Sequence, residues 1–302
     1  MLNHRFTALS RLLQCLLAVF ALMPLSSALA GTTLYEVSKG DHRVLLGGTI
    51  HLLHPDEFPL PDAFDAAYDE ADALYLEADL VAVQKPEFAQ RLMQAMLYPP
   101  GKSLNTELSP TVWERLKAYS ETNGFPVQNF LGFDPAFVSM VMTVMAAQQK
   151  GISDGVDAYY LNRAHRDGLP TGYLEDSDAV LSYMEALSGQ NGDDIIEATL
   201  ADLKRFDELM TSTVDAWRRG DLDALDQELG APMRREAPEM YDILMVKRNA
   251  EWLPEIERLF NDEAVELVLV GSLHLAGEHS LLAALKKRGY QVRPYQGPTT
   301  TH

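Results

Sequence analysis

"LLGGTIHLLHP", from Leu45 to Pro55, places two glycines in front of a histidine at the end of an apolar run. Near the other end of the chain, "LVLVGSLHLAGEHS", from Leu267 to Ser280, repeats the order of apolar strand, glycine, two residues, histidine and leucine. Glycine permits a close backbone approach or a positive φ where a strand turns, and ligand sites in open α/β sheets lie beyond the carboxyl ends of the strands. The repeat therefore predicts two strand ends that share one site.

The segments around these two phrases alternate between strand and helix patterns. Residues 32–53 predict a β-hairpin that leads into a strand broken by glycine, and residues 72–80 predict a strand with Glu77 near its carboxyl end. Residues 263–296 predict strand, helix and strand. The expected fold class is α+β, or α/β-like: a central mixed sheet from the N- and C-terminal segments, with a large helical insertion at about 84–260 that contains one short strand, "LPTGYLE". Helices are expected at 61–71, 84–97, 109–124, 134–151, 155–168, 177–188, 192–218, 221–228 and 236–260.

The first thirty residues have the order of a secretory signal peptide. Arg5 and Arg11 precede a mostly apolar run, and "ALA" at 28–30 is a small-x-small cleavage signal. The apolar run is short for a membrane span, and an uncleaved anchor is the alternative. We therefore expect residues 1–30 to be removed, and a periplasmic or secreted protein with no stable membrane span after cleavage.

The composition of the remaining chain limits its chemistry. Residues 31–297 are expected to form a single domain, and 298–302 a disordered tail. Cys15 is the only cysteine and lies within the signal segment, so the cleaved chain has no disulfide, thiolate metal site or cysteine nucleophile. Without the two signal-peptide arginines, 23 Lys and Arg face 44 Asp and Glu, a net charge of −21 for residues 31–302. That charge argues against nucleic-acid phosphates or anionic lipid as partners.

A cation site in such a chain must use histidine and carboxylate ligands. His51 and His274, the histidines of the repeated phrase, are not enough for a divalent ion, and a carboxylate must complete the set. Glu77 and Asp79, at the end of "LYLEADL", are placed for this; we prefer Glu77 and keep Asp79 as a supporting or alternative ligand. A centre of two histidines and a carboxylate leaves positions open for water and substrate. Either histidine alone would more often be a buried, hydrogen-bonded residue at a strand end, but the matched pair favours a site.

Five stretches, in their order along the chain, resemble one protein family. They are "GGTIHLL", "YLEADL", "GVDAYYLNRAHRDGLPTGYLE", "KRNAEWLPEIERLF" and "VLVGSLHLAGEHSLLAALKKRGYQV". Together they resemble the TraB/GumN family, which includes the Tiki metalloproteases and is similar to a wider superfamily with erythromycin esterases and haem-binding ChaN-like proteins. The resemblance covers essentially all of the chain after the signal segment.

The resemblance implies a role for each of five residues. His51, His274 and Glu77 match the proposed metal ligands of the family, and Mn²⁺ or Co²⁺ is the implied cofactor, with Zn²⁺ or Fe²⁺ as alternatives. Arg248 matches an arginine that would orient a carboxylate ligand or hold a substrate carboxylate. Glu175 matches a glutamate that would act as a general base. Glu77, Glu175 and Arg248 are thus the catalytic residues that the resemblance implies.

The resulting hypothesis is a periplasmic or secreted metal-dependent hydrolase, and in particular a peptidase with a peptide or protein substrate. One alternative is a non-catalytic periplasmic protein that binds a peptide signal or haem in the same cleft. Another is a metal-free esterase that uses a histidine–glutamate pair. The sequence leaves open the oligomeric state and the roles of His54 and His279.

Overall fold

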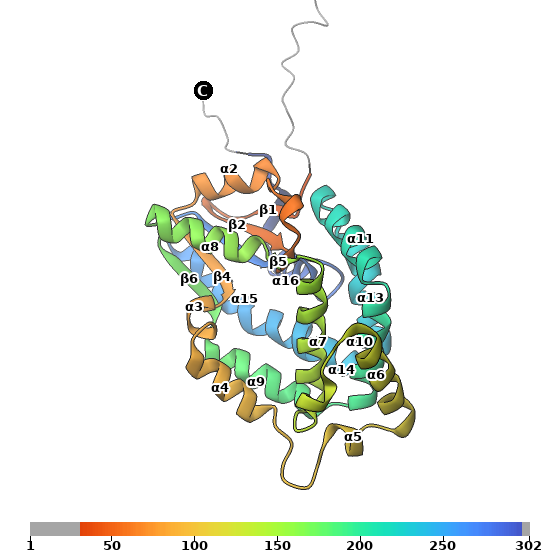
Figure 1. Cartoon of the computed structure of the whole chain (residues 1–302). Coiled ribbons are helices and arrows are strands. Elements are labelled where there is room, and N and C mark those ends of the chain that lie inside the picture. Colours follow the sequence, from red (N-terminus) through yellow and green to blue (C-terminus); the bar gives the residue numbers. More distant parts are fainter. Residues whose placement is uncertain (1–30, 298–302) are drawn as a thin grey trace, which may run out of the picture.

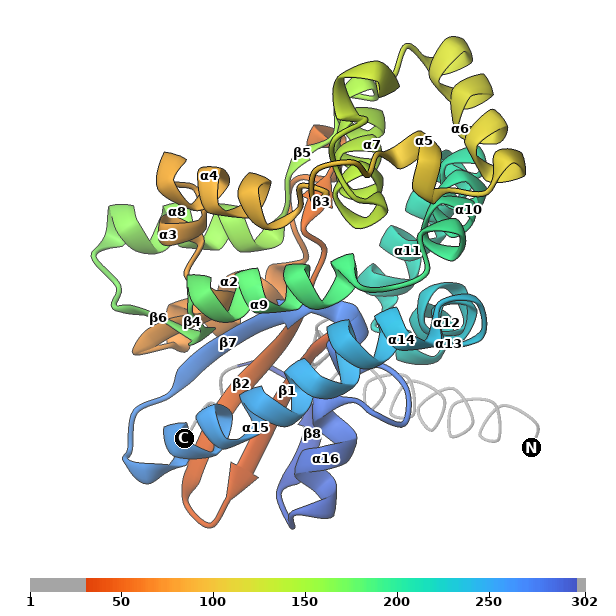
Figure 2. The same cartoon turned by 90° about the horizontal axis from the view of Figure 1, so that it is seen from below.

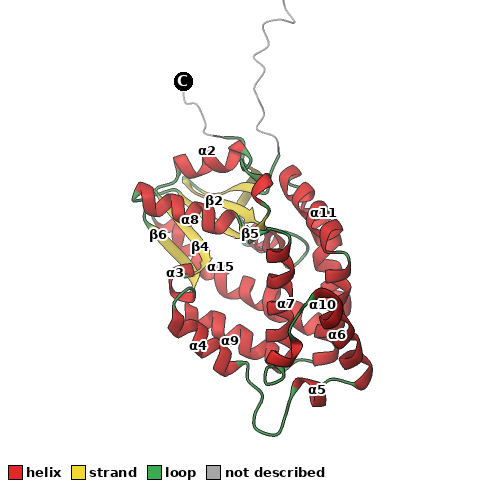
Figure 3. Ribbon diagram, viewed as in Figure 1, coloured by secondary structure: helices red, strands yellow, loops and turns green. Residues whose placement is uncertain are grey.

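The computed structural model describes residues 31–297 (Figure 1). The predicted signal peptide, 1–30, and the predicted tail, 298–302, lie outside the described residues. Within the described part, no helix is long and apolar enough to cross a membrane. The fold class is α+β, as predicted: helices surround a mixed sheet (Figure 3).

The strands form one large and one small sheet. They are β1 (Leu34–Lys39), β2 (His42–Thr49), β3 (Leu52–Leu53), β4 (Ala73–Ala78), β5 (Ser153–Asp154), β6 (Thr171–Glu175), β7 (Glu266–Gly271) and β8 (Gln291–Pro294). The large sheet has the order β6-β4-β7-β2-β1-β8, and the small one pairs β3 with β5. β7 runs parallel to both β4 and β2, whereas β1 is antiparallel to β2 and β8. Strands from both ends of the chain therefore meet in the middle of one sheet.

The helices occupy most of the middle of the chain. They are α2 (Asp62–Glu70), α3 (Leu80–Val83), α4 (Pro86–Ala95), α5 (Leu104–Glu107), α6 (Pro110–Asn123), α7 (Pro135–Gln149), α8 (Val156–Asp167), α9 (Ser177–Ser188), α10 (Gly192–Lys204), α11 (Phe206–Arg219), α12 (Leu222–Leu225), α13 (Ala231–Glu236), α14 (Pro238–Tyr241), α15 (Arg248–Arg258) and α16 (Leu281–Lys287). Two π-helical turns, Asp226–Gly230 and Asp242–Lys247, precede α13 and α15.

Alternating side chains of the central strands bury both faces of the sheet. In β2, Leu45 belongs to the apolar cluster that contains Phe64 of α2 and Trp217 of α11. Its neighbours in the strand belong to the opposite cluster, which contains Trp252 of α15. Every residue of β7 is buried, as expected for a parallel strand covered on both faces. Figure 2 shows α15 lying along the sheet and α16 beside it.

The structure corrects two of the expected helices. The helix expected at 192–218 is two helices, α10 and α11, separated at Arg205, because the two parts bury different partners: α10 packs against α7, and α11 packs on the sheet through Trp217. The helix expected at 236–260 contains the π-helical turn Asp242–Lys247.

Candidate functional site

The two Gly-x-x-His phrases meet at the carboxyl ends of β2 and β7. The last residues of these strands, Thr49 and Gly271, lie opposite each other in a parallel pair. His51 follows β2, and His274 lies in the 3-10 turn after β7. Glu77 is near the end of β4, which pairs with the other edge of β7. In Figure 1 these strand ends and α15 lie in the middle of a ring of helices that includes α4, α7, α8 and α9. The fold thus brings the predicted strand ends and Glu77 together.

Gly271 leaves open the space that these side chains share. A Cβ at this position would lie 2.9 Å from His51 Nε2 and 3.1 Å from Glu77 Oε1. The φ of Gly271 is −52°, so the backbone itself does not demand glycine. Of the two explanations for a glycine at this strand end, the close approach applies and the positive φ does not. The N–H of Gly271 also donates to Glu77 Oε1.

Asp157, in the first turn of α8, holds the imidazole of His51. His51 Nδ1 donates to Asp157 Oδ2 over 2.8 Å, and Thr49 Oγ1 donates to Asp157 Oδ1 over 2.7 Å. The start of α8 is fixed in turn, because the N–H of Gly155 donates to the backbone oxygen of His51 over 2.9 Å. His51 Nε2 lies 3.8 Å from Glu77 Oε2, and the His51 side chain is 58% exposed. His51 is therefore the solvent-accessible side of the site.

An amide, rather than a carboxylate, holds His274. His274 Nδ1 lies 2.7 Å from Asn249 Oδ1, and Asn249 Nδ2 donates to the backbone oxygen of His279 over 2.9 Å. Because the amide nitrogen already has this acceptor, Asn249 Oδ1 must accept, so the proton of neutral His274 is on Nδ1 and its Nε2 carries a lone pair. That Nε2 lies 3.6 Å from Glu77 Oε1, and the His274 side chain is 3% exposed. Two acceptor atoms thus face each other in a buried position.

Arg248 joins Glu77 to Glu175. Its guanidinium donates to Glu77 Oε2 over 3.1 Å and to the two oxygens of Glu175 over 2.6 and 3.2 Å. Trp252 Nε1 donates to Glu175 Oε2 over 2.7 Å, and its ring lies against that of His274, with 4.4 Å between the centroids. The Glu175 side chain is 2% exposed. This network fixes the Glu77 carboxylate through Oε2, the oxygen that also lies nearest to His51.

The electrostatics give the three central groups different charges. Asp157, assisted by Glu77 and opposed by desolvation, raises the pKa of His51 to about 10. Burial disfavours an ionised Glu77, but His51 and Arg248 together hold the pKa of its carboxyl at about 2. Burial lowers the pKa of His274 to about 3. Near neutral pH the site therefore has an ionised carboxylate between one cationic and one neutral imidazole.

His51, His274 and Glu77 are the groups at this site that could hold a divalent cation. Imidazole nitrogen with carboxylate oxygen suits Mn²⁺, Co²⁺, Zn²⁺ or Fe²⁺. Two ligand atoms, each about 2.1 Å from one ion, lie no more than about 4.2 Å apart; the separations of 3.8 and 3.6 Å to Glu77 are within that range. In residues 31–297, however, no group of three or more His, Cys, Asp or Glu side chains already has the arrangement of a metal centre. The donor types and the space at Gly271 fit an ion, and small movements would be needed to bind it.

The other predicted polar residues lie at the margin. Asp79 caps α3, with its Oδ1 accepting from the N–H of Ala82 over 2.9 Å. His54 accepts from the N–H of Asp56 and caps a short 3-10 turn. His279 is exposed and lies beside Tyr241. The structure gives these three side chains local contacts of their own.

Sequence analysis missed the two residues that orient the histidines. Asp157 is one acid among many in the helical insertion, and Asn249 lies next to Arg248 in a stretch quoted only for the family resemblance. A first-turn aspartate in "GVDAYY" and the adjacent Arg-Asn pair were the only signals. Neither specifies a partner more than twenty residues away along the chain.

Comparisons with known proteins identify the family of the chain. The family model described as TraB/PrgY/gumN matches residues 33–294. Two curated relatives, each called uncharacterized protein YbaP, come from Escherichia coli (strain K12) and Shigella flexneri. Each is 26% identical over 249 residues, which cover 82% of this chain and 89% of the relative. No solved structure matches the chain significantly.

Proposed function

The chain belongs to the TraB/PrgY/gumN family, and on that premise we propose that it is a periplasmic or secreted metal-dependent hydrolase that cleaves peptide bonds. His51, His274 and Glu77 hold a divalent ion, Mn²⁺ or Co²⁺ in preference to Zn²⁺ or Fe²⁺. The peptide or protein substrate and the preferred ions follow from the resemblance to the Tiki metalloproteases. The compartment follows from the signal-peptide pattern of residues 1–30.

One observation carries the proposal: His274 Nε2 lies 3.6 Å from a Glu77 oxygen. The nitrogen has a lone pair because Asn249 fixes the proton on Nδ1, and the carboxylate is ionised. Two buried acceptors that face each other with no donor between them are unfavourable. A cation between them would satisfy both, and at His51 it would replace a proton.

In this proposal each residue around the ion has a separate role. A bound divalent ion supplies a Lewis acid for a carbonyl oxygen. Asp157 and Asn249 hold the two imidazoles in position, as ligand-supporting groups commonly do. Arg248 keeps Glu77 ionised and oriented, and the substrate approaches on the exposed side of His51.

The contacts of Glu175 favour a positioning role over the general-base role that the family resemblance implies. Glu175 is buried, and both of its oxygens accept from Arg248 or Trp252. We therefore assign Glu175 to the positioning of Arg248 rather than to proton transfer, and Asp79 to the cap of α3.

The decisive experiment measures cation binding and hydrolysis on the same protein. Titration calorimetry of chelator-treated protein is expected to show one site for Mn²⁺ or Co²⁺, which is lost in His51→Ala and His274→Ala. His165→Ala, an exposed histidine on α8, is the matched control and should bind normally. A peptide library should be cleaved only when the ion is present. Unchanged affinity in both site variants would refute the centre.

A metal-free esterase is the second candidate, because His51 and Asp157 form a hydrogen-bonded pair that would act as a general base at alkaline pH, where His51, with a pKa of about 10, loses its proton. In that case chelation would leave activity intact, and Asp157→Asn would reduce it. Ester turnover that is insensitive to EDTA would favour this alternative over the peptidase.

The proposed periplasmic or secreted location can be tested separately. The N-terminal sequence of the protein recovered from the periplasm or medium is expected to begin at Gly31. Recovery of the full precursor from the cytoplasm alone would contradict the assignment.

A further inference from the structure

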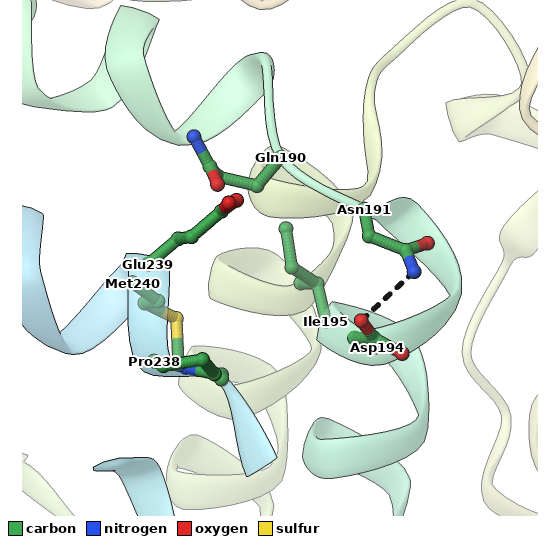
Figure 4. Close-up of a pocket in the computed structure, with 8 residues that line it drawn as sticks. Gln190, Asn191, Asp194, Ile195, Pro238, Glu239 and Met240 are labelled. Carbon is green, nitrogen blue, oxygen red and sulfur yellow. Dashed lines mark hydrogen bonds between the residues drawn. The ribbon is translucent and has the colours of Figure 1, made fainter. Parts of the chain in front are cut away.

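A cavity of about 310 Å³, separate from the candidate site, lies between α14 and the junction of α9 with α10. Figure 4 shows its polar side chains, among them Gln190, Asp194 and Glu239, around a floor that contains Ile195 and Met240. None of the residues that line it belongs to the candidate site described above. It therefore needs its own explanation.

The polar side of this cavity consists largely of acceptor atoms. Gln190 Oε1 is buried and has no hydrogen-bond partner among the described residues, while Gln190 Nε2 donates to the backbone oxygen of Ala186. Figure 4 shows the Glu239 carboxylate pointing toward that amide oxygen. Asp194 Oδ2 accepts from Asn191 Nδ2 over 2.8 Å. The cavity thus presents two carboxylates and an unsatisfied amide oxygen.

The position of the acids in their helices explains only part of this. Asp194 and Glu239 lie in the first turns of α10 and α14, where a negative charge offsets the helix dipole. That does not account for a carboxylate directed at a second acceptor whose donor is missing. A cationic donor between them would satisfy both oxygens, and an ammonium group offers three N–H bonds and a positive charge.

The apolar side continues into the interior. Ile195 and Met240 also line an inner cavity of about 240 Å³ between α7, α10 and α11, whose other walls include Leu203, Phe206 and Leu209. Methionine is flexible and adapts to irregular contacts, so rotation of Met240 would join the two spaces. An alkyl group that enters from the polar mouth would then be removed from water.

We propose that this cavity binds an apolar primary amine. Its ammonium group lies between Glu239 and Gln190, Asp194 adds negative charge to the lining, and its alkyl arm packs on Ile195 and Met240. The net charge of −19 for the chain favours the approach of a cation. The proposal is independent of the hydrolase assignment.

Titration calorimetry with three six-carbon probes tests the class of ligand. Hexylammonium is expected to bind at least about tenfold more tightly than hexanol, which lacks the charge, and hexanoate is expected to bind more weakly than both. Lengthening the amine from butyl to octyl should raise the affinity about fourfold for each added methylene. Equal affinities for hexylammonium and hexanoate, or no binding of hexylammonium, would overturn the proposal.

Variants of the lining residues test whether hexylammonium binds in this cavity. The double variant Glu239→Gln and Asp194→Asn should weaken hexylammonium at least about tenfold and leave hexanol unchanged. Met240→Trp, which fills the floor, should weaken both. Glu185→Gln, an exposed acid on α9, is the matched control, and His51→Ala separates this cavity from the candidate ion centre; both should bind like the wild type. If the double variant and Met240→Trp also bind hexylammonium normally, the amine lies elsewhere and the assignment is wrong.

Discussion

Replacing Gly271 with alanine is expected to remove cation binding while the fold remains intact. The new Cβ would lie 2.9 Å from His51 Nε2, whereas ordinary contacts begin at 3.4 Å, so the imidazole must move by about half an ångström. Since the separation from Glu77 is already 3.8 Å, that movement takes the pair to or beyond the roughly 4.2 Å that one ion can bridge. We expect the Kd for Mn²⁺ to rise about 100-fold, the upper end of what the loss of a supporting group costs.

Folding should be nearly unaffected by the same change. The φ of Gly271 is ordinary for alanine, at −52°, and the His51 side chain, 58% exposed, can swing toward solvent. Tm, measured by circular dichroism, should therefore fall by no more than about 4 °C. Gly132→Ala, whose Cβ has no neighbour nearer than 3.7 Å, is the matched control for both measurements. Wild-type affinity for Mn²⁺ in Gly271→Ala, by calorimetry, would refute the geometric reasoning.

Three further predictions concern stability and can be measured by urea unfolding. Trp252→Phe removes the indole donor to the buried Glu175 carboxylate and should cost about 2 kcal/mol; a loss below about 0.5 kcal/mol would mean that Arg248 alone suffices. Gly155→Ala should cost about 3 kcal/mol or more, because the Cβ would lie 1.9 Å from the backbone oxygen of Ile50; a stable variant would show that α8 can withdraw from the site. Burial raises the pKa of Glu266 to about 6 from an ordinary 4.5. The folded state therefore favours its protonated form, and stability falls as the pH rises through that interval. Glu266→Gln should be more stable than the wild type by roughly 1 kcal/mol at pH 8 and about equal at pH 4; a constant difference would contradict this.

The strand ends, and the side chains that they bring together, are the part of the site that local sequence could predict. Each Gly-x-x-His phrase follows an apolar run that could only be a buried strand, and Glu77 ends another. Strand ends of this kind share an edge of the sheet. The actual register is set by pairing: Thr49 lies opposite Gly271, so the two glycines of the repeated phrase are offset by one residue.

The orienting residues could not be predicted because their partners depend on tertiary docking. Asp157 reaches His51 only because β5 pairs with β3 and the start of α8 bonds to the loop after β2. Two-residue strands leave no periodicity in a sequence. Asn249 faces His274 because the π-helical turn before α15 sets the rotation of that helix. Residue propensities do not predict such turns.

The position of β7 also sets the order in which the candidate site is assembled. This strand separates β2 from β4, yet it is synthesised after both of them and after the whole helical middle. A chain that stops before Glu266 contains His51 and Glu77 but lacks β7, the strand that joins β2 to β4. It also lacks Gly271 and His274. The candidate site can therefore be assembled only after β7 and His274, which lie near the end of residues 31–297, have been synthesised.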